Sequence, residues 1–136
     1  MTDYFFMDTT APTGAIVQRG IRWLIDDVSD DESAILHIPV WSNLQGSLEA
    51  ALGPMITKNL KKNKTANIEG TTIHLSSDAS MASGVGKVKL LCLYSRSEEL
   101  DTIESHFRDI SRILVVPWIS SDISEWKEVR RAVELG

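Results

Sequence analysis

Three short apolar runs constrain the fold of this 136-residue chain more than any other feature. They are residues 34–40, 88–94 and 112–118, which read AILHIPV, VKLLCLY and RILVVPW. Each run is about the length of a strand and is apolar on both faces, which is typical of a strand that is covered on both sides. Fully covered strands of this kind occur mainly in parallel sheets that carry helices on their faces.

Amphipathic helical patterns separate these runs. Val17, Ile21 and Leu24 recur at helical spacing before the first run, and a second apolar stripe falls within residues 100–110. The helical pattern after the first run is interrupted at Gly53-Pro54, so we expect a kink or two consecutive helices there. Gly20 lies inside the first helical pattern and weakens it.

Strands that alternate with helices predict right-handed crossovers and parallel pairing. We therefore predict one Rossmann-like α/β domain over residues 1–136, with a mostly parallel sheet of about four to five strands and helices on both faces. Residues 71–76 form a shorter strand, and residues 4–7 form an edge strand or a hydrophobic plug. The pairing of 71–76 stays open, because its link of about eleven residues to the next run permits a hairpin or a crossover.

The charge pattern indicates which partners to expect. The net charge is −5, with nineteen acidic and fourteen basic side chains, so we expect neither nucleic acid nor an anionic membrane surface as a partner. Residues 1–52 are acidic with only two basic side chains, whereas residues 53–96 hold seven bases and two acids. No apolar stretch reaches the length of a membrane span. The single cysteine, Cys92, forms no intrachain disulfide, so a reducing compartment such as the cytoplasm is expected.

Ligands of open α/β sheets bind beyond the carboxyl ends of the strands, and polar residues follow the predicted strands at these positions. From this set we select Asn43, Ser95, Arg96 and Ser121 as candidate ligand-binding residues. Helix N-termini that follow these turns favour an anion, and Arg96 could form a fork to a phosphate or carboxylate. The alternative is that these residues only cap helices, as Ser95 and Glu98 would in a capping box. The remaining strand-end residues are Trp41, Ser42, Gln45, Ser77, Asp78, Ser97, Trp118 and Ser120.

Other motifs predict no specific chemistry. Residues 83–87, SGVGK, lack the first glycine and the Ser/Thr of a phosphate-binding loop and precede a strand rather than follow one. Cys92 lies among leucines and His37 lies between Leu36 and Ile38, so both are expected in the core, His37 with one hydrogen-bond partner. No histidine spacing indicates a metal site, and no cofactor or catalytic residue is assigned.

Two classes of function follow from this sequence, and enzymatic activity is left open. The first is a small α/β domain that binds an anionic or nucleotide-like ligand at the carboxyl ends of the strands. The second is a non-catalytic protein-interaction module, most simply a homodimer, which four tryptophans and the opposed charge blocks favour.

Overall fold

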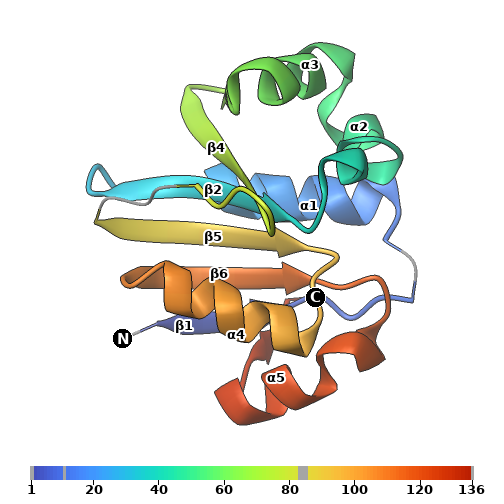
Figure 1. Ribbon diagram of the computed structural model, residues 1–136, viewed down its shortest axis with the longest axis vertical. Coiled ribbons are helices and arrows are strands. Elements are labelled where there is room, and N and C mark those ends of the chain that lie inside the picture. The colour runs from blue at the N-terminus through green and yellow to red at the C-terminus, as the bar shows by residue number, and fades with distance from the viewer. Residues whose placement is uncertain (1, 11, 83–85, 136) are drawn as a thin grey trace.

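A sheet between two helical layers forms the body of the molecule, as the computed structural model shows for residues 2–10, 12–82 and 86–135 (Figure 1). Its strands in this part of the chain are β1 Asp3–Phe6, β2 Glu32–Ile38, β3 Thr65–Ile68, β4 Thr71–Ser77, β5 Lys87–Leu93, β6 Ile110–Val116 and β7 Val133–Glu134. The helices are α1 Gly14–Ile25, α2 Ser47–Leu52, α3 Pro54–Asn63, α4 Ser97–His106 and α5 Ser124–Arg130, with two short 3-10 helices, η1 Trp41–Leu44 and η2 Ser120–Ile123.

The strand order is β3-β4-β2-β5-β6-β1-β7. Every neighbouring pair is parallel except β3 and β4, which form an antiparallel pair. The predicted mostly parallel α/β sheet is confirmed, and the strand predicted at 71–76 pairs with β2 in parallel. The expected number of four to five strands is wrong, because the sheet of the described residues has seven. Two strands were not predicted from the sequence, namely β3, a four-residue hairpin arm, and β7, which has two residues.

The three apolar runs lie side by side in the sheet as β2, β5 and β6, and their residues alternate between two cores. Leu91 and Leu114 belong to one core, and their neighbours Leu90 and Ile113 belong to the other. Cys92 has no exposed surface, as expected for a core cysteine. Coverage of both faces therefore explains why these strands read as continuous apolar runs.

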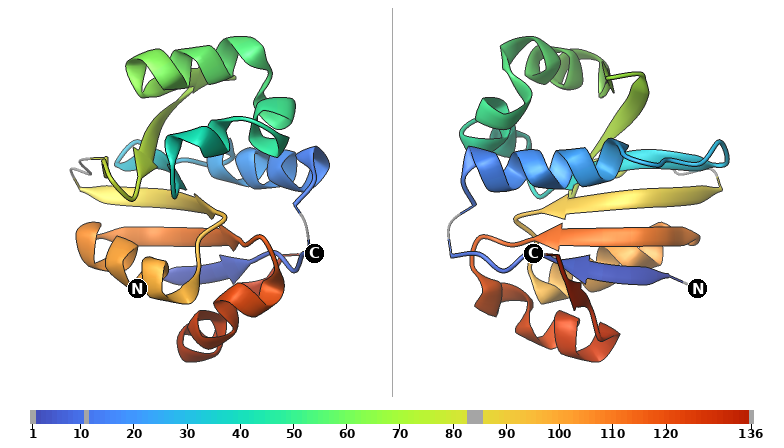
Figure 2. Two further views of the ribbon diagram at one scale, coloured as in Figure 1. Left: turned by 45° about the vertical axis from the view of Figure 1, so that its right-hand side comes forward. Right: turned by 180° about the vertical axis from the view of Figure 1, so that it is seen from behind.

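Helices α1, α2 and α3 cover one face of the sheet, and α4 and α5 cover the other (Figures 1 and 2). The interruption at Gly53-Pro54 separates α2 from α3, so two consecutive helices are confirmed there. A Cβ atom at Gly20 would lie 3.4 Å from Cδ1 of Leu91, which is ordinary van der Waals contact, so the packing of α1 on β5 does not require a glycine here.

The chain changes its direction of winding between β2 and β5. From β2 it passes over one face, through α2 and α3, to β4 on one side, and from β5 it passes over the other face, through α4, to β6 on the opposite side. The two connections therefore diverge at the carboxyl ends of β2 and β5 (Figure 2). We call this place the switch point.

Two further observations concern the chain as a whole. No helix in the described ranges has both the length and the apolar character that crossing a bilayer requires. The segment that faintly resembles a phosphate-binding loop includes residues 83–85, which lie outside the described residues.

Candidate functional site

A buried histidine marks the switch point. His37 is the penultimate residue of β2 and has no exposed surface. The parallel pairing of β2 with β4 places it opposite Ser76, and its pairing with β5 places it opposite Cys92. The sheet therefore brings a titratable side chain to the carboxyl edge while keeping it inside the protein.

Both ring nitrogens of His37 have partners. Nε2 lies 2.8 Å from Oδ1 of Asp78, and Nδ1 lies 3.0 Å from Oγ of Ser76. Because an ionised carboxylate can only accept, Nε2 carries the proton and the Ser76 hydroxyl donates to Nδ1. Burial lowers the pKa of His37 below its ordinary value of 6.5, although the Asp78 carboxylate opposes this shift. His37 is thus neutral and has two partners, not the single partner expected from the sequence.

Asp78 extends this chain of contacts to a second carboxyl group. Glu99, in the first turn of α4, lies within hydrogen-bonding reach of Asp78, and its Oε1 accepts from Nε of Arg96 at 3.2 Å. Burial raises the pKa of Glu99, and the nearby charge of Asp78 raises it further, against the lowering effect of Arg96. A proton on Glu99 turns one of its oxygens into a donor, and Asp78 is the acceptor within reach.

Two buried side-chain oxygens in the described residues have no hydrogen-bond partner, namely Oγ of Ser95 and Oε2 of Glu99. Ser95 lies in the connection between β5 and α4, and Glu99 lies in the first turn of α4. Ser95 has no exposed surface and follows Tyr94, whose left-handed backbone, with φ of 65°, turns the chain away from the sheet. When Glu99 is ionised, its Oε2 and the Asp78 carboxylate are both acceptors, so Oε2 is paired only by a proton shared with Asp78 or by a donor from outside.

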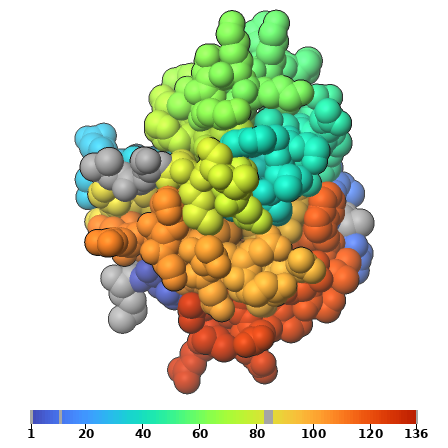
Figure 3. Space-filling model, viewed as in Figure 1, coloured from blue at the N-terminus to red at the C-terminus, as the bar shows by residue number. Residues whose placement is uncertain are grey.

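A small cavity opens beside the carboxyl pair. It has a volume of about 150 Å³ and is lined by Asp78, Met81, Glu99 and Thr102. Figure 3 shows the segment after β4, in yellow-green, lying against the orange surface of α4, with the teal surface of η1 and α2 on its other side. This volume is below the range of about 300–1,000 Å³ that is typical of drug-sized ligands, so the cavity fits one ring-sized group.

The four residues predicted from the sequence occupy different settings. Ser95 lies in the connection between β5 and α4, and Arg96 follows it with an exposed guanidinium that pairs with Glu98 at 3.7 Å as well as with Glu99. Oδ1 of Asn43 accepts from the backbone N–H of Val40 at 3.1 Å, so this amide oxygen bonds to the backbone of its own loop. Ser121 is exposed on η2, after β6. The structure thus places Ser95 and Arg96 side by side, while ligand binding by all four residues stays a prediction.

The capping box predicted from Ser95 and Glu98 is wrong. Helix α4 begins at Ser97 with Arg96 as its N-cap, and no side chain caps it. Helix α4 therefore begins one residue later than expected, after the left-handed turn at Tyr94, and the Ser95 hydroxyl is buried instead of bonded to the helix N-terminus.

Aromatic side chains cover the next part of the edge. The rings of Tyr94 and Trp118 stack with centroids 4.0 Å apart, and the Tyr94 hydroxyl lies 2.7 Å from Oγ of Ser47. Trp41 packs against the core with Nζ of Lys64 4.2 Å above its ring. The ends of β5 and β6 are therefore covered by an aromatic pair, and the polar cavity lies on the β2–β4 side of it.

The chemistry of this cluster is that of hydrogen-bond acceptors. Within the described ranges, no three His, Cys, Asp or Glu side chains come together in an arrangement that could hold a metal ion. Asp78 and Glu99 supply carboxylate oxygens, Ser95 supplies a hydroxyl, and His37 fixes the position of Asp78. Asp78 is one of the strand-end residues predicted from the sequence, but its contact with His37 could not be predicted, because it depends on the register between β2 and β4.

No model of a protein family matches the chain, and neither the curated proteins nor the solved structures searched contain a match.

Proposed function

We propose that the protein binds a small ligand at the switch point, between the carboxyl ends of β2 and β5, and that this ligand carries hydroxyl or amino donors. The observation that carries the proposal is Oε2 of Glu99, a buried oxygen without a hydrogen-bond partner on a side chain that lines the cavity beside Asp78. A ligand that donates to this atom of the ionised carboxylate would remove the cost of about 1–3 kcal/mol that a buried unpaired group carries.

The position of the cluster supports the proposal independently of its chemistry. In open α/β sheets the crevice for the ligand forms where successive connections leave in opposite directions. Here one connection leaves from β2, which bears His37, and the other leaves from β5, which leads into Ser95. The cavity beside Asp78 and Glu99 opens at the same edge.

The ligand expected from the sequence is anionic or nucleotide-like, and the charges of the site favour hydroxyl or amino donors over an anionic group. Arg96, the basic residue expected to bind an anion, is already paired with Glu98 and Glu99. The two carboxyl groups at the cavity would repel a phosphate but accept hydrogen bonds from sugar hydroxyls or from a base amino group. One ring of a nucleoside, or another small polyhydroxyl or amino compound, therefore suits the cavity better than a simple anion.

Thermal-shift and calorimetric titrations test this proposal. The probes are the four common ribonucleosides, their monophosphates, ribose and putrescine, each up to millimolar concentration. We expect at least one donor-bearing probe to stabilise the protein, and each nucleoside to bind at least as well as its monophosphate. The absence of stabilisation by every probe would overturn the proposal.

A pair of variants tests the site itself. Glu99→Gln should weaken binding about tenfold, because the amide offers one acceptor where the carboxylate offers two. Glu98→Gln is the matched control, since Glu98 is adjacent, exposed and also paired with Arg96. Equal affinities of both variants and the wild type would place the ligand elsewhere.

A second candidate function is the non-catalytic interaction module. It is favoured by exposed apolar residues after β2 and β6, namely Val40, Trp118 and Ile119, whose relative exposures are 54%, 45% and 42%. Such side chains suit a protein interface, most simply one between two copies of this chain. Light scattering at high protein concentration decides the homodimer form, and a strict monomer would exclude it.

A further inference from the structure

Two carboxyl groups line the cavity at the switch point, and a fixed donor holds each of them. Oδ1 of Asp78 accepts from Nε2 of His37 at 2.8 Å, and the backbone N–H of Asp78 donates to the carbonyl oxygen of Pro39 at 3.2 Å. Oε1 of Glu99 accepts from Nε of Arg96 at 3.2 Å. The other oxygen of Glu99, Oε2, is buried and has no partner among the described residues. The pair of carboxyl groups is therefore one donor short.

Two kinds of donor can satisfy Oε2 of Glu99. The first is a proton held between Glu99 and Asp78, because the two groups lie within hydrogen-bonding reach of each other. The second is a hydroxyl or amino group of a ligand in the cavity that these residues line. Both donors would occupy the same place beside Oε2, in a cavity of about 150 Å³. The proton and the ligand therefore exclude each other.

The groups around Glu99 favour a proton on this carboxyl. Burial raises the pKa of Glu99, and the charge of Asp78 raises it further. Arg96 opposes this effect, but its guanidinium is 60% exposed and also lies 3.7 Å from Glu98. Because burial lowers the pKa of His37, the ring behind Asp78 brings no positive charge. The charged and titratable groups that the described residues bring to Glu99, directly or through one neighbour, are Asp78 after β4, His37 of β2, Arg96 and Glu98 at the start of α4, His106 at its end and Asp122 of η2.

We propose that the switch point takes up an amine in exchange for the proton that Asp78 and Glu99 share when no ligand is bound. The exchange rests on the proposed function, because it takes place at the same site. The positive charge of an ammonium group replaces the charge of the released proton, and its N–H groups donate to Oε2 of Glu99. A neutral hydroxyl would leave two neighbouring carboxylates without a compensating charge, so it suits the exchange less well.

The exchange makes binding depend on pH. While Glu99 is protonated in the free protein, each ammonium group that binds releases up to one proton. The affinity then rises by up to about tenfold per pH unit, because one proton competes with one ligand. At higher pH, where the free protein no longer holds the proton, the affinity becomes constant. Since the pKa of Glu99 is raised from 4.5, the rising part of this curve lies above that pH.

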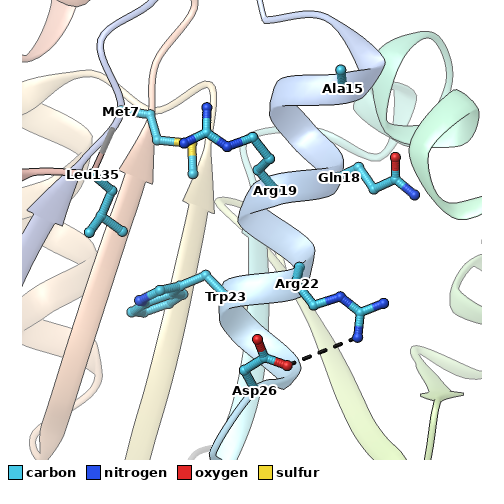
Figure 4. A pocket seen from close by; sticks show the side chains of 8 residues that line it. All are labelled: Met7, Ala15, Gln18, Arg19, Arg22, Trp23, Asp26 and Leu135. Carbon is cyan, nitrogen blue, oxygen red and sulfur yellow. Dashed lines mark ion pairs between the residues drawn. The ribbon is translucent and has the colours of Figure 1, made fainter.

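A larger hollow away from the switch point has to be distinguished from it. This groove of about 540 Å³ is lined by residues of α1 together with Met7 and Leu135 (Figure 4). Its carboxylate, Asp26, lies 4.0 Å from Nη1 of Arg22, so that charge already has a counterion. Arg19 lines the groove as well, so an amine would meet two guanidinium groups there. The groove therefore suits an amine less well than the cavity beside Glu99.

Calorimetric titration with putrescine tests the proposal, and 1,4-butanediol is the matched neutral probe, with hydroxyl groups in place of both ammonium groups. Titrations at about pH 5.5 in acetate and in MES, two buffers with different enthalpies of ionisation, give the number of protons released. We expect putrescine to bind more tightly than the diol and to release up to one proton. Its affinity should rise with pH by up to about tenfold per unit and level off toward neutral pH.

Four variants locate the exchange. Glu99→Gln should bind putrescine more weakly and release no proton. Asp78→Asn keeps an oxygen for Nε2 of His37 and offers an amide donor to Glu99, so it should also bind without releasing a proton. Glu98→Gln, next to the site, and Gln18→Ala, in the groove beside α1, should both release as many protons as the wild type.

The outcomes separate this exchange from the proposed function. Putrescine binding without proton release, equal affinities for putrescine and the diol, or wild-type proton release in Glu99→Gln would each overturn the exchange alone. Binding of a nucleoside but not of putrescine would do the same. Failure of every probe to bind, nucleosides and ribose included, would overturn both.

Discussion

Nε2 of His37 lies 2.8 Å from Oδ1 of Asp78, and this contact joins the buried end of β2 to the segment that leaves β4. The histidine has no exposed surface, while the side chain of the aspartate is 41% exposed. The pair therefore connects the core of the sheet to the wall of the cavity at the switch point. Its stability and its pH dependence are both measurable.

Replacing the histidine should destabilise the protein in a pH-dependent way. His37→Gln loses at least one of two hydrogen bonds, so we expect a loss of about 1–3 kcal/mol at neutral pH. Burial lowers the pKa of His37 from 6.5, so the wild type loses stability as the pH falls below 6.5, where the unfolded chain takes up a proton. The difference in the free energy of unfolding between the wild type and His37→Gln should therefore become smaller below pH 6.5. Urea unfolding across this pH range measures it, and His74→Gln on β4, as the control, should keep the wild-type slope.

Glu99 should show the opposite pH dependence. Burial and the charge of Asp78 raise its pKa above 4.5, so the folded protein holds a proton that the unfolded chain has released. Wild-type stability should therefore fall as the pH rises through this window, and Glu99→Gln should gain stability relative to wild type over the same range. Unfolding curves from pH 4 upward provide the test. A constant difference between the two proteins would show that Glu99 ionises as freely as in the unfolded chain.

Glu32 at the start of β2 should stabilise the fold strongly. Its side chain is 3% exposed and contacts the Ser111 hydroxyl, the Ser29 backbone N–H at 2.9 Å and Arg112 at 2.7 Å. Burial opposes its ionisation, but these hydrogen bonds together lower the pKa of Glu32 to about 2. We expect Glu32→Gln to cost about 2–3 kcal/mol at pH 7.

The same lowered pKa sets the pH at which this contribution disappears. It should be complete above pH 4.5 and be lost as the pH falls toward about 2, where wild type and Glu32→Gln should become equally stable. Asp31→Asn is the control, since that carboxylate is 67% exposed and pairs with Lys87 at the surface. A cost for the control equal to that of Glu32→Gln would contradict the assignment.

Because the pKa of Lys89 is lowered, we expect this residue to increase the stability of the protein in alkaline solution. Its side chain is buried under α1, and burial together with the nearby charge of Arg112 lowers its pKa from 10.5 to about 8. The unfolded chain therefore holds more protons between pH 8 and 10.5, so this group makes the folded protein more stable as the pH rises. The free energy of unfolding of the wild type should therefore increase relative to that of Lys89→Met over this pH range. Lys87→Met, on the same strand but 42% exposed, should show no such shift.

The sequence predicted the parts of the fold that depend on local pattern. The three apolar runs are adjacent strands, although β2 and β6 begin two residues earlier than expected because Glu32 already pairs with Lys87 and Ile110 with Val88. Pro39 and Pro117 follow β2 and β6 by one residue, where a missing N–H ends the pairing. Strands β3 and β7 escaped prediction because two to four residues give too little pattern for a periodicity argument.

The candidate site was only partly predictable, because it depends on which strands are neighbours. The rule that ligands bind at strand ends led to Ser95 and Arg96. The pair formed by His37 and Asp78 links residues that are far apart in sequence, and only the order of β4, β2 and β5 brings them together. Burial of the Ser95 hydroxyl likewise follows from the left-handed backbone at Tyr94, which no sequence pattern announces.

The position of β1 between β6 and β7 has a consequence for the order of folding. Asp3 pairs with Arg112 and Phe6 with Val115, so nearly the whole domain separates each residue of β1 from its partner. Contacts so distant in sequence form slowly, because the entropy of closing a long loop is lost before the contacts contribute any favourable free energy. On the ribosome, the apolar segment Tyr4–Phe6 emerges well before β6 and stays unpaired until that strand is made. This edge of the sheet is therefore completed last, and its aromatic residues are the part of the nascent chain that most needs protection from aggregation.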